Sequence, residues 1–133
     1  MKILIVDDSL LERKLLSGVL KKSGVEHEIL QAVDGEDAIQ VLGNHHQDIC
    51  LILLDWQMPK MNGIEFMKAV VKVPAVSHIP IVMVTASGSE DNKREARQTN
   101  PKLGGYIVKP YKPETVIETI KPFLKISTEK PAA

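Results

Sequence analysis

The sequence has little cysteine, few aromatic residues and no excess of charge of either sign. Its single cysteine, Cys50, excludes an internal disulfide and a zinc site built from several cysteines, and it is typical of a reducing compartment. Seventeen Lys and Arg residues balance seventeen Asp and Glu residues, so no overall basic field attracts nucleic acid or an anionic membrane. We therefore expect a cytoplasmic protein that binds no nucleic acid.

Long apolar runs are also missing. Only four apolar residues lie between Lys2 and Asp7, far fewer than the core of a signal peptide needs, and no later run reaches the length of a membrane span. We therefore expect no membrane insertion. The 133 residues, 44% of them hydrophobic, suit one globular domain. We place this domain at residues 1–126 and expect residues 127–133 to form a flexible tail.

Short apolar runs alternate with segments of helical periodicity along the whole chain. Five runs rich in aliphatic side chains predict strands at residues 2–6, 28–32, 49–54, 81–84 and 106–108. The run ICLILL at 49–54 is apolar throughout, which is typical of a strand buried on both faces of a sheet. We therefore expect it to lie in the interior of the fold.

Capping residues and helical spacing predict a helix after each strand. The expected helix starts are Ser9, Asp34, Asn62, Ser87 and Pro113, of which the first and fourth begin an S-x-x-E motif. The expected ends lie near residues 22, 42, 71, 98 and 119–121. Gly43 and Pro122 set two of these ends, because glycine is frequent just after a helix and proline interrupts one.

Five strands that alternate with five helices predict an α/β fold, with a five-stranded parallel sheet covered by helices on both faces. In a doubly wound sheet, the functional site lies beyond the carboxyl ends of the strands, where the strand order reverses. The residues that end these strands are Asp7, Asp8, Asp55, Thr85 and Lys109. We expect their side chains to converge at one edge of the sheet.

Three carboxylates in one crevice require compensating charge. Two unit charges about 4 Å apart, at an effective dielectric constant near 20, repel by about 4 kcal/mol. Lys109 supplies one positive charge, and a divalent cation is the natural remainder, with Mg²⁺ favoured by oxygen ligands. A carboxylate beside Mg²⁺, a hydroxyl group and a lysine can carry out phosphoryl transfer. Each residue alone would suit a cap, a turn or solvent, and only their conjunction predicts this chemistry.

Other chemically reactive side chains are given no part in this site. Cys50 lies within an expected strand and is interpreted as a buried core residue. His45 and His46 lack the spacing of metal ligands and are expected in a solvated loop. Tyr106 leaves two alternatives open, a ring that packs in the core and a mobile ring near the site.

Four motifs surround the expected site: ILIVDDS at the first strand, LILLDWQMPKMNG at the third, IVMVTA at the fourth and YIVKP at the fifth. Together they resemble the receiver domain of bacterial two-component response regulators, especially the stand-alone chemotaxis type, over about residues 2–124. The resemblance implies a flavodoxin-like sheet with strand order 2-1-3-4-5. It also implies a signalling protein that catalyses its own phosphorylation and dephosphorylation and turns over no external substrate.

The resemblance further implies a role for each acidic residue. Asp55 would accept the phosphoryl group. Asp8 and Asp55 would ligate Mg²⁺ together with the backbone carbonyl group of Gln57. Asp7 would hold the metal through a water molecule.

The remaining implied roles concern phosphate binding and switching. Thr85 and Lys109 would bind phosphoryl oxygens, the bond between Lys109 and Pro110 would be cis, and Thr85 and Tyr106 would form the switch. The implied phosphodonor is a sensor histidine kinase or a histidine phosphotransfer protein. A downstream target protein would bind the face formed by the fourth helix, fifth strand and fifth helix. The chain itself would be a monomer or a weak dimer.

Two other functions stay open on the residues alone. A haloacid-dehalogenase-like aspartyl-phosphate phosphatase uses the same groups, but it needs D-x-D after its first strand, where this chain has Asp7, Asp8 and Ser9. A flavin or nucleotide binder lacks support, because neither G-x-G-x-x-G nor a P-loop is present. The segment TNPKLGG at 99–105 also departs from the receiver pattern, which replaces it with a shorter turn.

Overall fold

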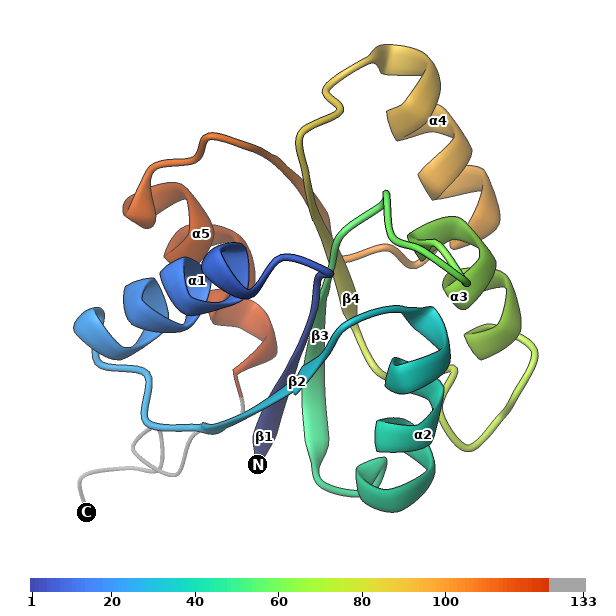
Figure 1. Cartoon of the computed structure of the whole chain (residues 1–133), viewed down its shortest axis with the longest axis horizontal. Helices are drawn as coiled ribbons and strands as arrows, with labels where there is room; N and C mark the ends of the chain where they lie inside the picture. Colours follow the sequence, from blue (N-terminus) through green and yellow to red (C-terminus); the bar gives the residue numbers. More distant parts are fainter. Residues whose placement is uncertain (125–133) are drawn as a thin grey trace.

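A computed structural model describes residues 1–124, and these form one α/β unit (Figure 1). The expected tail at 127–133 and the expected domain boundary at residue 126 lie outside the described residues. Five parallel strands form a single sheet in the order β2-β1-β3-β4-β5. Their bounds are β1 Lys2–Val6, β2 Glu28–Ala32, β3 Ile49–Leu54, β4 Ile81–Thr85 and β5 Gly105–Val108. The predicted fold class and strand order are therefore confirmed.

Helices cover both faces of the sheet (Figure 1). The helices are α1 Leu10–Lys22, α2 Gly35–His45, α3 Gly63–Val70, α4 Glu90–Thr99 and α5 Pro113–Ile120. In Figure 1, α1 and α5 lie on one side of the sheet, and α2, α3 and α4 lie on the other. The strand order reverses at β1, which pairs with both β2 and β3. This reversal places a crevice at the carboxyl ends of β1 and β3.

The central strand β3 supplies both halves of the core. All six of its residues are buried, and side chains alternate between the two faces because the strand period is two. Leu51 and Leu53 pack with α1 and α5, whereas Ile52 and Leu54 pack with α2 and α3. Full burial of one such aliphatic side chain stabilises the fold by roughly 2 kcal/mol. Cys50 is 2% exposed, as predicted for a core residue.

Two helix boundaries differ from the predictions. Helix α2 continues through Gly43 to His45, so His45 lies in the last turn of a helix and the predicted end at residue 42 is wrong. The N–H group of His46 donates a hydrogen bond of 2.8 Å to the carbonyl group of Leu42, and this bond prolongs the helix. The helical penalty of glycine, about 1 kcal/mol, is too small to end a helix that is anchored by buried Leu42.

The start of α4 also differs. The predicted cap, Ser87, lies two residues before the actual cap, Ser89, whose hydroxyl group accepts a 3.0 Å hydrogen bond from the N–H group of Asn92. Two serines within three positions competed for this role, and the backbone of Ser87 is instead bound to Tyr106. The expected early end of the last helix is confirmed, because α5 stops at Ile120 and a 3₁₀ turn, Lys121–Phe123, follows with its proline.

Candidate functional site

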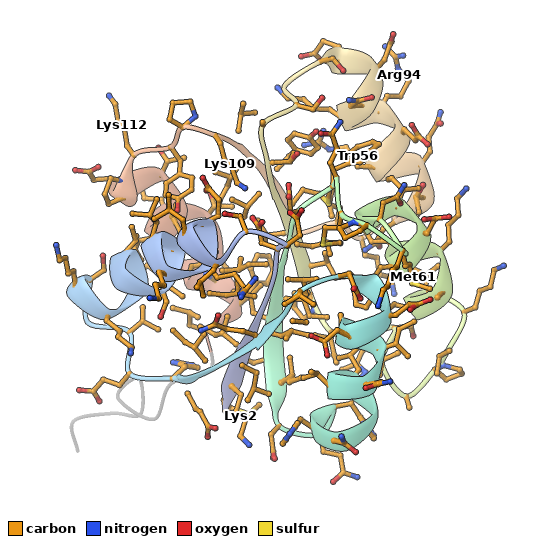
Figure 2. All side chains as sticks on the ribbon, in the orientation of Figure 1. Lys2, Trp56, Met61, Arg94, Lys109 and Lys112 are labelled. Carbon is orange, nitrogen blue, oxygen red and sulfur yellow. The ribbon has the colours of Figure 1, made fainter. Side chains whose placement is uncertain are left out.

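The five side chains that were expected to converge do so at the carboxyl ends of the strands. Asp7 and Asp8 follow β1, Asp55 follows β3, Thr85 ends β4 and Lys109 follows β5. All of them line one open cavity of about 700 Å³, together with Ser9, Glu12, Gln57, Met58, Pro59, Ala86 and Ser87. In Figure 2, Lys109 and Trp56 mark this end of the molecule, on the loops that follow β5 and β3.

Backbone hydrogen bonds from the sheet position the acidic residues. The N–H group of Asp55 donates to the carbonyl group of Val6 over 2.9 Å, and that of Asp7 donates to Ala32 over 3.1 Å. Gly63 sets the loop after β3, because a Cβ atom at residue 63 would overlap with the carbonyl oxygen of Asp55. Hydrogen bonds to the neighbouring strand therefore position Asp7 and Asp55. The close packing of Gly63 also fixes the backbone at Asp55.

Asp7, Asp8 and Asp55 form an acidic triad, in which one carboxylate oxygen from each residue lies within 4.8 Å of the others. Asp7 and Asp55 expose only 6% and 9% of their surface, whereas Asp8 is exposed. Three hard oxygen ligands at this separation suit a divalent cation such as Mg²⁺, which keeps several water molecules in its shell. The acidic triad can therefore bind a metal ion.

Lys109 partly neutralises the acidic triad. Its Nζ atom lies 2.8 Å from Asp7 Oδ2, 3.5 Å from Glu12 Oε1 and 3.9 Å from Asp55 Oδ1. Burial by itself lowers the pKa of Lys109, but the hydrogen bond to Asp7 and the nearby carboxylates hold that pKa above its ordinary value. The lysine is therefore charged at neutral pH. The peptide bond between Lys109 and Pro110 is cis, as expected.

Asp55 has an unusual protonation equilibrium. Burial and the negative charge of Asp7 raise its pKa from the ordinary 3.8 to about 6. The charge of Lys109, the N–H group of Trp56 and the hydroxyl group of Thr85 lower that pKa in part. Without a metal ion, the ionised form of Asp55 is therefore destabilised, and a cation would relieve the cost.

Tyr106 connects the site to the loop between β4 and α4. Its half-buried ring packs against the core below α3 and α4, and its hydroxyl group donates a 2.6 Å hydrogen bond to the carbonyl oxygen of Ser87. The side chain of Asn92 donates to the hydroxyl group of Ser87, and Lys93 Nζ lies 5.9 Å from the centre of the Tyr106 ring. The ring thus packs against the core, as the first alternative predicts, and its hydroxyl group reaches the loop after Thr85, whereas the mobility of the ring stays a prediction.

Sequence reasoning missed two residues of the site. Glu12 lines the cavity and pairs with Lys109, and it was read only as part of a capping motif. Arg13 is buried, and its Nη1 atom donates a 2.6 Å hydrogen bond to the carbonyl oxygen of Asp7. Their position in the first turn of the helix that follows Asp7 and Asp8 was the available signal, because such a turn must face the strand ends.

Comparison with known proteins identifies the family. Residues 3–121 match the response regulator receiver domain. The chain belongs to this family. The chemotaxis protein CheY of Pseudomonas aeruginosa is 36% identical over 121 residues, which cover 91% of this chain and 94% of that protein. A CheY homolog of Campylobacter jejuni is 32% identical over 133 residues, which cover 100% of this chain and 99% of the relative.

Solved structures of receiver proteins share the fold. Chemotaxis protein CheY4 of Vibrio cholerae superposes with a TM-score of 0.80 at 34% identity, covering 92% of this chain and 98% of that one. The CheY of the CheX-CheY-BeF3-Mg+2 complex from Borrelia burgdorferi has a TM-score of 0.80 at 29% identity, with coverages of 94% and 90%.

Family membership decides between the functions left open above. This response regulator is a phosphoacceptor signalling protein rather than a turnover enzyme, so the phosphatase and flavin-binding alternatives are set aside. As a receiver, it interacts with kinases and with target proteins. Within residues 1–124, no helix combines the length and the apolar character that crossing a membrane requires.

Proposed function

We propose that Asp55 is the phosphoacceptor of a two-component phosphorelay and receives its phosphoryl group from a phosphohistidine. The observation that carries this proposal is the cavity that holds Asp55 together with three further carboxylates, a buried threonine and a lysine ammonium group. Asp55 has all three kinds of partner as neighbours, since Lys109, Thr85 and Asp7 each affect its pKa.

The donor set fits Mg²⁺ as the resident metal. Asp8 and Asp55 would hold it directly, with the backbone carbonyl group of Gln57 as a third ligand from the cavity wall. Asp7 would act through a water molecule, because its Oδ1 accepts from the N–H group of Ser9 and its Oδ2 binds Lys109. When bound, the metal supplies positive charge at the phosphoryl oxygens and at the carboxylates.

In the proposed reaction, a carboxylate oxygen of Asp55 attacks phosphorus and forms a P–O bond. The P–N bond to the histidine of the donor breaks, and the imidazole leaves with the electron pair and takes up a proton. Lys109 Nζ and the hydroxyl group of Thr85 bind phosphoryl oxygens and stabilise their charge. The protein positions charged groups and needs no further nucleophile.

The new phosphoryl group would act on the switch residues Thr85 and Tyr106. Displacement of Thr85 towards the phosphate would alter the loop that carries Ser87, and with it the hydrogen bond from Tyr106. The face formed by α4, β5 and α5 would then change its affinity for a downstream target protein.

We further propose the cellular setting of this switch. The phosphodonor is a sensor histidine kinase or a histidine phosphotransfer protein, and the regulator acts in the cytoplasm as a monomer or weak dimer. The balanced charge of the chain gives it no general affinity for nucleic acid. The receiver domain would extend to residue 126.

A labelling experiment tests the phosphoacceptor. Acetyl phosphate or phosphoramidate with Mg²⁺ should add one phosphoryl group, detected by intact-mass spectrometry and by the fluorescence of Trp56, which adjoins Asp55. The Asp55→Asn variant should lose the label. Asp48→Asn is a matched control, because it makes the same change at an exposed residue just before β3, at the opposite ends of the strands. Equal labelling of the Asp55→Asn variant would refute the assignment.

A further inference from the structure

Glu12 occupies a special position at the mouth of the site. It lies in the first turn of α1, its side chain is 35% exposed, and its Oε1 atom lies 3.5 Å from Lys109 Nζ. It lines the site cavity and also a neighbouring cavity of about 550 Å³ between α1 and the loop after β5. A phosphodonor that enters the site from this side therefore passes the carboxylate of Glu12.

Charge balance sets Glu12 apart from the other carboxylates. The cavity is lined by four carboxylates and one ammonium group, a formal excess of three negative charges. A divalent cation would lower this excess to one. Under the proposed function, Asp7, Asp8 and Asp55 interact with the metal, and Asp7 makes the shortest contact with Lys109, at 2.8 Å. We therefore assign the remaining negative charge to Glu12, which lies 3.5 Å from Lys109 and is partly exposed.

Among the described residues, the side chain of Glu12 makes no hydrogen bond within α1. The cap of α1 uses the backbone N–H group of Glu12, which donates to Ser9 Oγ over 3.2 Å. The N–H group of Ser9 is bound to Asp7 Oδ1 rather than to the carboxylate of Glu12. Replacing this carboxylate therefore leaves the helix cap in place.

We propose that Glu12 is a specificity-determining residue that selects phosphodonors by their charge. With a divalent cation bound, the carboxylate of Glu12 keeps the mouth of the site negative. It therefore slows the entry of small free phosphodonors in proportion to their negative charge. The inference rests on the proposed phosphoryl transfer to Asp55. It predicts that a dianionic acyl phosphate is penalised more than a monoanionic phosphoramidate.

Two small donors of different charge test this inference. At neutral pH acetyl phosphate is a dianion and phosphoramidate a monoanion, and Trp56 fluorescence reports the initial phosphorylation rate with each at saturating Mg²⁺. Glu12→Gln should raise the second-order rate constant about fivefold for acetyl phosphate and about twofold for phosphoramidate at low ionic strength, as expected for charges roughly 8 Å apart in water. High salt should shrink both increases.

Control variants separate charge from structure. Glu118→Gln removes the same charge from an exposed position on α5 and should leave both rate constants unchanged. Glu12→Asp keeps the charge and should retain the donor preference of the unmodified protein. An equal change with both donors, or the same change in Glu118→Gln, would overturn the inference. Absence of any labelling in the unmodified protein would instead overturn the proposed phosphoacceptor function.

Discussion

The interior of the sheet is built from apolar side chains, whereas the carboxyl ends of its strands carry charged ones. In β3, six consecutive buried residues meet apolar partners on both faces. One residue further, Asp55 exposes 9% of its surface and has Asp7 as a close neighbour of like charge. The apolar interior stabilises the fold. The buried like charges at the strand ends destabilise it, and they form a charged site that can bind a ligand.

The largest expected effect lies in the interior. Phe66 is fully buried, and Phe66→Ala should destabilise the protein by about 3–5 kcal/mol, because it removes apolar burial and leaves a cavity. Urea unfolding followed by circular dichroism measures this loss. Leu15→Ala is the control, since Leu15 is 52% exposed, and it should cost less than about 1 kcal/mol. Similar losses for the two variants would show that burial in the interior is not the main source of stability.

At the strand ends, removing a charge should have the opposite sign. Asp55→Asn should stabilise the metal-free protein at pH 7 by about 1–2 kcal/mol, a value lowered from the full pKa shift because solvent in the open cavity screens the charge. Asp48→Asn should change stability by less than about 0.5 kcal/mol. A destabilised Asp55→Asn protein would show that the acidic triad is not strained.

The same pKa predicts a pH dependence. Because the folded-state pKa of Asp55 is about 6 and the ordinary value is 3.8, the folded protein binds this proton more tightly than the unfolded chain. The stabilising contribution is complete below about pH 4 and is lost as pH rises through 6. Thermal unfolding of the metal-free protein between pH 4 and 7 should show this loss, and Asp55→Asn should lack it.

Magnesium should offset the destabilisation that the carboxylates cause at the strand ends. At pH 7, millimolar Mg²⁺ should raise the free energy of unfolding by about 1–2 kcal/mol through binding to the folded state. The gain should be smaller at pH 5, where Asp55 is protonated in most molecules. Asp8→Ala should abolish most of the gain, and a full gain in that variant would exclude Asp8 as a ligand.

The smallest expected effect concerns the link between the two regions. Tyr106→Phe removes the hydrogen bond to the carbonyl oxygen of Ser87 and should cost about 1 kcal/mol of stability. Tyr111→Phe, which removes a hydroxyl group outside this network, is the matched control. Chemical denaturation distinguishes the two, and an equal loss would show that the Ser87 contact contributes nothing specific.

Local patterns carried most of the information about the elements. Aliphatic runs located all five strands, and Pro122 located the early end of α5. Errors arose where two local signals competed, as at Ser87 and Ser89, or where tertiary burial outweighed a weak preference, as at Gly43 in α2. Glu12 and Arg13 escaped notice because an amphipathic pattern does not reveal which polar residue turns inward.

The amino-acid sequence by itself determined the order of the elements, the fold class and the set of polar residues at the strand ends. These follow from hydrophobic periodicity and capping, which act over a few neighbouring residues. Only the tertiary structure decided that Glu12 faces Lys109 and that Arg13 donates a hydrogen bond to the carbonyl oxygen of Asp7. It also decided that the hydroxyl group of Tyr106 binds the carbonyl oxygen of Ser87. Such contacts join residues through the packing of whole elements, and the distance and burial that set their charges exist only after the sheet and helices have assembled.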